Sequence, residues 1–158
     1  MRKGFTLTEI LIYIAILAII ISAVSSFFLW QINSGAKSRA IREVQYNTEQ
    51  ALSIMTKEIR EAKSVYTPTS IFDVNLGQLS LETATSYIDF FLCGTRLCQK
   101  KESQDPIALT SGMVQINNLI FNYIATTSTV PSIQVNLKIN YNDQASFGAT
   151  STVSLRSY

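Results

Sequence analysis

The sequence predicts an α+β fold in which a long N-terminal helix packs on a C-terminal head of antiparallel β-sheet. An uncharged apolar run lies near the N-terminus, and a stretch with apolar residues at helical spacing follows it. From residue 67 onwards, β-branched and aromatic residues alternate with polar ones. Helical patterning followed by a series of strands is typical of α+β domains with an antiparallel sheet.

The composition argues against catalysis by the commonest routes. The chain has 158 residues, 47% of them hydrophobic and 15% charged, a net charge of +2 and no histidine. Without histidine, Ser-His-Asp and Cys-His arrangements cannot form. The phosphate-binding patterns GxxxxGK[ST] and GxGxxG are also absent. We therefore expect a protein that is not an enzyme, with no cofactor, no metal and no small-molecule substrate.

The segment from Ile10 to Trp30 is long and apolar enough to cross a membrane. It contains 21 residues and no charge, and a helix of that length spans about 30 Å, the thickness of the bilayer core. Arg2 and Lys3 precede it, so the positive-inside rule predicts a cytoplasmic N-terminus and an external head. A cleaved secretory signal ending near the small residues at 22–26, a plain anchor and a buried core helix are the alternatives.

Glu9 is the unexpected residue of this region, because it places a carboxylate at the edge of the apolar run. Such a group costs a few kcal/mol to desolvate unless an opposite charge or a donor pairs with it. The sequence therefore predicts a partner for Glu9.

The segment "KGFTLTEILIYIAILAIII" resembles the N-terminus of class III prepilins, the precursors of type IV pilins and type II secretion pseudopilins. The resemblance implies a leader over residues 1–4, with Arg2 and Lys3 as its basic residues. It implies that prepilin peptidase cuts between Gly4 and Phe5 and methylates the new N-terminal residue, Phe5.

In this family the fifth mature residue is a glutamate, which corresponds to Glu9 here. After cleavage the free amine of Phe5 in one subunit can pair with Glu9 of a neighbour. Both charges would lie in a medium of low dielectric, where opposite charges attract strongly and an unpaired charge is costly. We therefore expect Glu9 to set the register between subunits, with residues 5–30 forming the transmembrane and assembly helix.

The pattern of residues 31–66 predicts that this helix continues as an amphipathic helix. We therefore expect one uninterrupted helix from Phe5 to Tyr66. Thr67-Pro68 would end it, since the residue before proline resists helical geometry. The helix would pack on the head, with a coiled coil to another protein as the alternative. Its apolar or small residues recur at steps of three and four, at Ile41, Val44, Thr48, Leu52, Met55, Ile59, Ala62 and Tyr66.

Two features of the helix bear on the kind of subunit. Asn33-Ser34-Gly35 is a weak point, because glycine costs about 1 kcal/mol in a helix relative to alanine. Many major pilins also carry a helix-bending proline where this chain has Ser26, and no proline occurs before Pro68. That departure favours a minor subunit.

Residues 67–158 predict a β-rich globular head. In the fourth expected strand, the odd-numbered residues from Ile133 to Tyr141 are apolar or aromatic and would face the core. We expect turns at Asn142-Asp143 and Asp105-Pro106 and a Thr/Ser-rich loop at 126–129. The expected strands are 78–83, 87–93, 114–125, 133–141 and 151–157.

The two cysteines, Cys93 and Cys98, predict a small structural disulfide if the head lies in an oxidising compartment. A free buried pair is the alternative. The spacing does not fit a redox CxxC motif, and a zinc site would need two further ligands that cannot be histidine.

Arg96, Lys100 and Lys101 form a small basic cluster. Three charges give only a weak, salt-dependent attraction to nucleic acid, so a solvated loop is the preferred interpretation. Glu102 and Asp105 are close in sequence, and we interpret them as part of a solvated loop rather than a calcium site.

The order of segments is similar to the J class of minor pseudopilins, with "LSIMTKEIREAKSVY" on the helix and "STVSLRSY" at the C-terminus. The resemblance implies a structural subunit that waits in the inner membrane and enters a filament in the periplasm or at the cell surface. Its partners would be prepilin peptidase, an assembly ATPase, an assembly platform protein and other pilin or pseudopilin subunits. Type II secretion or pilus biogenesis is the expected role. A surface pilus for adhesion, twitching motility or DNA uptake and a tethered binding domain that never polymerises are the alternatives.

Overall fold

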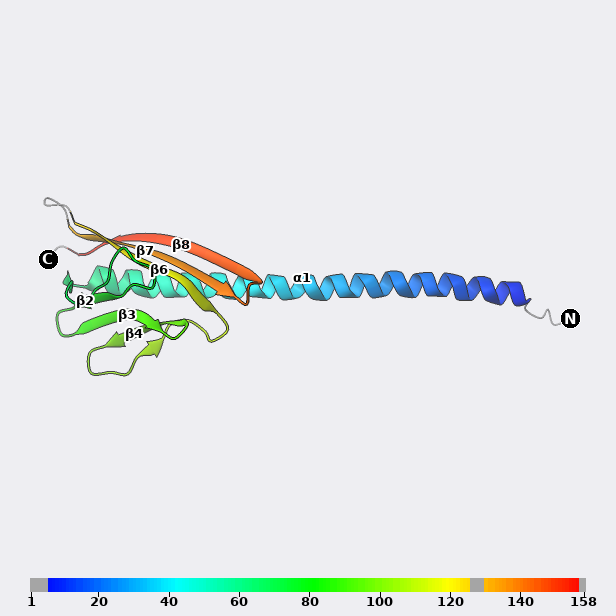
Figure 1. Cartoon of the computed structure of the whole chain (residues 1–158), viewed down its shortest axis with the longest axis horizontal. Helices are drawn as coiled ribbons and strands as arrows, with labels where there is room; N and C mark the ends of the chain where they lie inside the picture. Colours follow the sequence, from blue (N-terminus) through cyan, green and yellow to red (C-terminus); the bar gives the residue numbers. More distant parts are fainter. Residues whose placement is uncertain (1–5, 126–129, 157–158) are drawn as a thin grey trace. The chain divides into compact units, whose positions relative to one another are not determined.

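The chain begins with one long helix, α1 (Leu7–Glu61), which Figure 1 shows in blue to green. The computed structural model describes residues 6–125 and 130–156, so the expected loop at 126–129 lies outside it. The chain forms two compact units, Met1–Arg39 and Ala40–Tyr158. Helix α1 contributes residues to both units, which are described separately below.

Helix α1 ends at Glu61. The expected end at Tyr66 is therefore wrong, because the helix stops more than one turn earlier. The backbone of Lys63 instead donates to Glu82 O at 2.8 Å, and that of Tyr66 donates to Ser80 O at 2.9 Å. Between these two bonds lies a short strand, β1 (Ser64–Val65). Pairing with a strand distant in sequence thus ends the helix before Pro68 can do so.

The amphipathic stripe on the second half of α1 faces the core of the head, as its spacing predicts. Val44, Met55 and Ile59 are each no more than 1% exposed. The two ends of the predicted stripe differ, since Ile41 is 41% exposed and Tyr66, which lies beyond the helix, is 36% exposed. The stripe also includes residues that the apolar pattern omitted, namely Ala40, Asn47 and Ala51.

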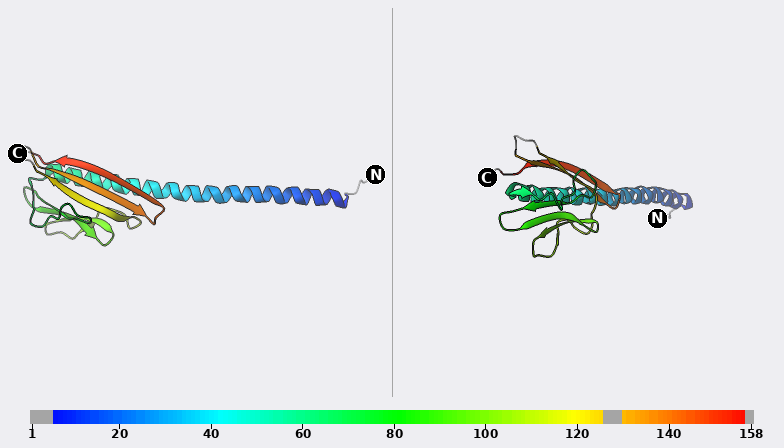
Figure 2. Two further views of the ribbon diagram at one scale, coloured as in Figure 1. Left: turned by 45° about the horizontal axis from the view of Figure 1, so that its top comes forward. Right: turned by 60° about the vertical axis from the view of Figure 1, so that its left-hand side comes forward.

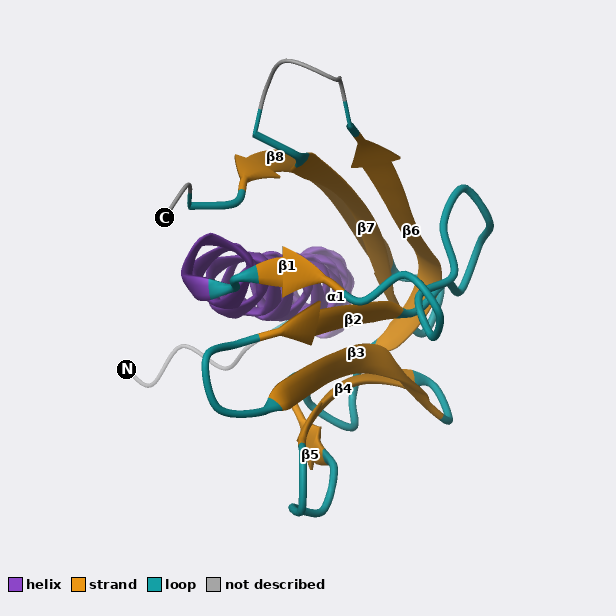
Figure 3. Cartoon of the chain, turned by 90° about the vertical axis from the view of Figure 1, so that its left-hand side faces the viewer, coloured by secondary structure: helices purple, strands orange, loops and turns teal. Residues whose placement is uncertain are grey.

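Two antiparallel sheets cover this part of α1, where the sequence predicted one. The first sheet has five strands in the order β1-β2-β3-β4-β5, and the second has three in the order β6-β7-β8. Figure 3 shows them spreading apart around the C-terminal part of the helix. Their bounds after β1 are β2 (Leu79–Glu82), β3 (Tyr87–Cys93), β4 (Arg96–Lys101), β5 (Ile107–Ala108), β6 (Gln115–Ile124), β7 (Ser132–Tyr141) and β8 (Ala145–Ser154).

The strands β2, β3, β6 and β7 confirm four of the five predicted segments. The last strand, β8, begins at Ala145, six residues before the expected start at 151. A tight turn fixes this start: Gln144 N donates to Tyr141 O at 2.9 Å, and Asn142 and Asp143 have φ of 43° and 57°. Asparagine and aspartate tolerate this left-handed conformation better than most residues do.

The core lies between α1 and the two sheets as one continuous cluster. Phe90 and Leu97 enter it from the first sheet and Phe121 and Leu137 from the second, each no more than 2% exposed. Burial of each such side chain contributes about 1.5–3 kcal/mol. Met55 of α1 is 0% exposed and belongs to the same cluster.

Polar contacts fasten the helix to each side of the head. Asn47, which is 2% exposed, accepts the backbone N–H of Ser111 at 2.7 Å, and Ser111 Oγ donates to Glu43 Oε1 at 2.9 Å. Glu58 Oε1 accepts from Gln99 Nε2 at 3.0 Å and pairs with Lys101 Nζ at 3.0 Å. These contacts hold the loop before β6 and the strand β4 against α1.

Candidate assembly site

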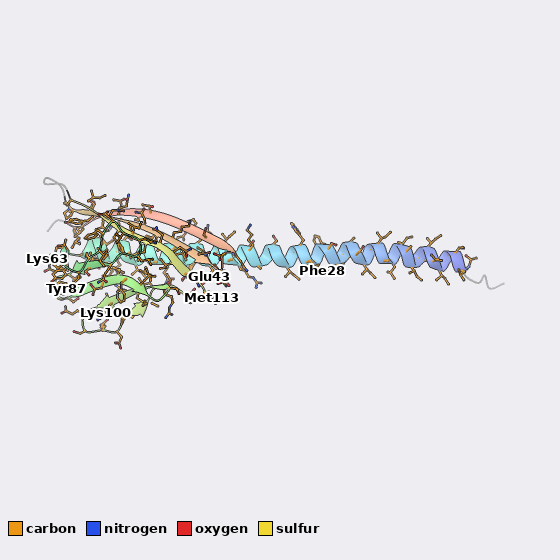
Figure 4. All side chains as sticks on the ribbon, in the orientation of Figure 1. Phe28, Glu43, Lys63, Tyr87, Lys100 and Met113 are labelled. Atoms are coloured by element: carbon orange, nitrogen blue, oxygen red, sulfur yellow. A yellow bond between two sulfur atoms is a disulfide. The ribbon has the colours of Figure 1, made fainter. Side chains whose placement is uncertain are left out.

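The first half of α1 exposes a continuous apolar surface. In Figure 4 its side chains, Phe28 among them, project from the helix along this stretch. Such a surface is unstable in water and needs lipid or other apolar helices around it. The exposed large apolar residues of this segment are Leu7, Ile10, Leu11, Ile12, Tyr13, Ile14, Ile16, Leu17, Ile19, Ile20, Ile21, Val24, Phe27, Phe28, Leu29, Trp30 and Ile32.

By length and composition, α1 is the one helix among the described residues that could cross a membrane. Two of its three serines between Ile10 and Trp30, Ser22 and Ser26, are compatible with hydrocarbon, because the helix itself satisfies their hydroxyls. Ser22 Oγ donates to Ile19 O at 2.8 Å, and Ser26 Oγ donates to Ser22 O at 2.9 Å. Lipid or a neighbouring helix therefore meets no unpaired hydroxyl donor at Ser22 or Ser26.

Glu9 lies in the first turn of α1 and is exposed. Its Oε2 atom is 3.5 Å from both the backbone nitrogen and the Oγ1 atom of Thr6. Thr6 also accepts the backbone N–H groups of Glu9 and Ile10 through its carbonyl oxygen, at 3.1 and 3.3 Å. The reach of Glu9 back to the backbone N–H of Thr6, three residues earlier, corresponds to one half of a capping box with Thr6 at the N-cap position.

Thr6 is thus a site residue that the sequence reasoning missed. The signal was available, since Thr-x-x-Glu before an apolar run predicts a helix start. Its consequence is that Glu9 has an intramolecular role in addition to any pairing with a second subunit. The carboxylate is directed towards the N-terminal end of the helix, where it contacts Thr6.

Four predicted site residues, Arg2, Lys3, Gly4 and Phe5, lie outside the described residues. The cleavage site at Gly4-Phe5 and the methylation of Phe5 therefore remain predictions.

The described part of the chain defines a structural class of protein. Proteins of this class have a β-rich head and a long helix whose first half is suited to a membrane or a helical bundle. The comparisons with known proteins narrow this class. Residues 1–25 match the family model described as the prokaryotic N-terminal methylation motif. No curated protein and no solved structure gave a match.

The chain therefore carries a class III prepilin signal, which is consistent with type IV pilins and pseudopilins. The motif indicates a pilin-like precursor that prepilin peptidase processes and that assembles with other pilin subunits. It points to a structural subunit. Together with the apolar helix it fits a single-pass anchor in the inner membrane.

The cysteines lie far along the chain from this site. A disulfide joins Cys93 and Cys98, with their Cα atoms 5.9 Å apart. It spans the turn between β3 and β4, where Gly94 has φ of 69°. Glycine at the first position of a two-residue hairpin turn suits this conformation.

The basic cluster does not form a solvated loop, and that expectation is wrong. Arg96, Lys100 and Lys101 all belong to strand β4. Because side chains alternate along a strand, Lys101 shares the face of Gln99 and pairs with Glu58. Lys100 lies on the other face, in register with Asp89. The three cations therefore present no common basic surface.

Glu102 and Asp105 lie in the turn and loop that follow β4. The carboxylate of Glu102 accepts the backbone N–H of Tyr87 at 3.2 Å, which closes the open end of the β3–β4 hairpin. Within residues 6–125 and 130–156, no group of three or more His, Cys, Asp or Glu residues is arranged to hold a metal ion.

Proposed function

We propose that this chain is a minor subunit of a type IV pilus-like filament that serves type II protein secretion or pilus biogenesis. The observation that carries the proposal is the prepilin signal at residues 1–25 on a helix whose apolar side chains are exposed from Leu7 to Ile32. A subunit of this kind is stable in the membrane and can later bury the same surface against identical or related helices.

In this proposal, prepilin peptidase cuts between Gly4 and Phe5 and methylates Phe5. The processed subunit waits in the inner membrane with its head outside. An assembly platform protein then moves it into the filament, where helix–helix packing replaces helix–lipid contacts. The chain performs no catalysis in this role.

Glu9 acts twice in this mechanism. In the separate subunit, its carboxylate supports the start of α1 through Thr6, where the helix dipole also favours a negative charge. In the filament, it pairs with the amine of Phe5 in a neighbouring subunit. In this ion pair both the amine and the carboxylate are charged and surrounded by apolar helices. Loss of either partner therefore leaves a buried, unpaired charge, which costs several kcal/mol. That cost penalises subunits that enter out of register.

The absence of a helix-bending proline supports a minor rather than a major subunit. No proline occurs between Phe5 and Pro68, and α1 runs unbroken through Ser26 and Gly35.

Mass spectrometry of the mature N-terminus tests the proposal. We expect a chain that begins at methylated Phe5. A chain that still begins at Met1, or one cut near Ser26, would contradict it in favour of a tethered or secreted domain. Deleting the gene and assaying secretion and twitching motility in parallel then separates a secretion filament from a surface pilus.

A further inference from the structure

Strand β8 forms one edge of the three-stranded sheet, and its backbone groups can be assigned to the paired or the free side. Leu155 N donates to Pro131 O at 3.0 Å, one step beyond the register pair Ser132–Ser154. Residues of antiparallel strands alternate between paired and outward-facing backbone groups. The even-numbered residues therefore direct N–H and C=O to the free edge: Ser146, Gly148, Thr150, Thr152 and Ser154.

The side chains support this assignment, because residues opposite one another at non-hydrogen-bonded positions lie closest together. Three contacts link even-numbered residues of β7 and β8: Ser132–Ser154 at 2.9 Å, Gln134–Thr152 at 3.4 Å and Asn136–Thr150 at 2.7 Å.

The opposite edge of the same sheet, at β6, is covered by the chain itself. Asp73 N donates to Phe121 O at 2.9 Å, and Gly77 N donates to Leu119 O at 3.0 Å. Between them, the side chain of Asn75 accepts from Leu119 N at 3.1 Å and donates to Asn117 O at 3.2 Å. The amide of Asn75 thus takes the place of a neighbouring strand.

The remaining sheet edges are too short to bind a partner strand. Strands β1 and β5 have 2 residues each, whereas β8 has 10. Natural edge strands are usually protected by charges, proline, a bulge or a covering segment. The β8 sequence, ASFGATSTVS, contains no charge and no proline, and its pairing with β7 shows no register shift. Figure 2 shows β8, in red, at the margin of its sheet.

A hollow of about 640 Å³ lies beside the C-terminal half of β8, between this strand and the end of α1. Two guanidinium groups, Arg60 and Arg156, and one carboxylate, Glu61, line it together with Thr152, Val153 and Ser154. Among the described residues, the lining of this hollow therefore carries more guanidinium than carboxylate groups.

We propose that the free edge of β8 binds an extended segment of another protein by strand addition, with a carboxylate of that segment beside the exposed Arg60. Main-chain hydrogen bonds to the even-numbered residues provide the affinity, and the charged hollow provides the selectivity. A second copy of β8 does not suit the site, because residues 145–154 contain no carboxylate. The proposal is independent of polymerisation.

The test uses the full chain in detergent micelles and fluorescent decapeptides of alternating valine and threonine. One peptide carries glutamate near each end, and its matched control carries lysine at the same positions. In fluorescence anisotropy, we expect the glutamate peptide to bind about tenfold more tightly, as expected for close charge pairs at an interface. Arg60→Glu should reverse this preference.

Thr152→Pro removes an N–H group that faces the free edge, and it leaves every backbone hydrogen bond to β7 in place. Edge strands tolerate proline at such positions. We expect this substitution to abolish binding, while Thr152→Val, which keeps the N–H, retains it. A glutamate peptide N-methylated at alternate residues should also fail to bind, and this readout does not depend on the folding of a variant. Equal binding of the methylated and unmethylated peptides would overturn the proposal. So would self-association of the chain that Thr152→Pro abolishes, because the occupant would then be a second copy.

Discussion

The carboxylate of Glu9 lies 3.5 Å from the backbone nitrogen of Thr6, so the residue expected to fix subunit register also caps its own helix. The two roles need different chemistry. A capping box works with glutamine as well as glutamate, whereas pairing with an ammonium group needs a negative charge. A single substitution can therefore separate them.

We predict that Glu9→Gln keeps the helix start but enters filaments poorly. Glu9→Ala loses both functions, and Thr6→Ala weakens only the cap, by about 0.5–2 kcal/mol. The measurement is the fraction of mature, methylated protein found in sheared or purified filaments. Normal incorporation of Glu9→Gln would show that the charge is dispensable, and Thr6→Ala serves as the matched control for an effect on the helix alone.

The sequence predicts the fold well where local patterning and tertiary packing agree. The alternation in β7 places Ile133, Val135 and Leu137 in the core, and all three are no more than 2% exposed. The α+β prediction is confirmed because the apolar stripe of α1 and the alternating strands bury their apolar faces against each other.

The missed elements depend on residues distant in sequence. Strand β4 is polar over most of its length and forms by pairing with β3 and through the contacts of Gln99 and Lys101 to Glu58. Strand β1 forms only through its antiparallel pairing with β2. No local pattern carries this information.

The candidate site was predictable in part. The motif around Glu9 is local, and so is the Thr6 signal that was overlooked. The separation of Lys100 from Lys101 onto opposite faces could not be predicted without first knowing that β4 is a strand.

The disulfide gives a second prediction. Replacing both Cys93 and Cys98 with alanine should lower the free energy of unfolding of the head by about 2 kcal/mol, because the bond closes only a short loop. Urea denaturation of the full chain in detergent measures this difference. In the wild-type chain isolated without reductant, we expect both cysteines to resist alkylation until a reductant is added. Alkylation of the folded chain without reductant would show free thiols instead.

A third prediction concerns the core contact of α1. Met55 is 0% exposed, so Met55→Ala should cost about 2–5 kcal/mol through lost burial and the cavity that remains. Tyr46 lies on the same helix but is 64% exposed, and Tyr46→Ala should change stability by about 0.5 kcal/mol or less. Equal effects of the two substitutions on urea unfolding would contradict the packing of α1 described here.

The last prediction concerns the polar contact between α1 and the loop before β6. Asn47 is buried and accepts the Ser111 N–H at 2.7 Å, so Asn47→Ala leaves that donor without its partner and should cost about 1–3 kcal/mol. Amide hydrogen exchange provides a local readout, since the Ser111 amide should lose protection while the amides of β7 keep theirs. Gln50→Ala, an exposed position on the same helix, is the control and should leave Ser111 protected. If the Ser111 amide stays protected in Asn47→Ala, the side chain of Asn47 does not hold this loop. The hydrogen bond from Ser111 Oγ to Glu43 would then be enough to hold it.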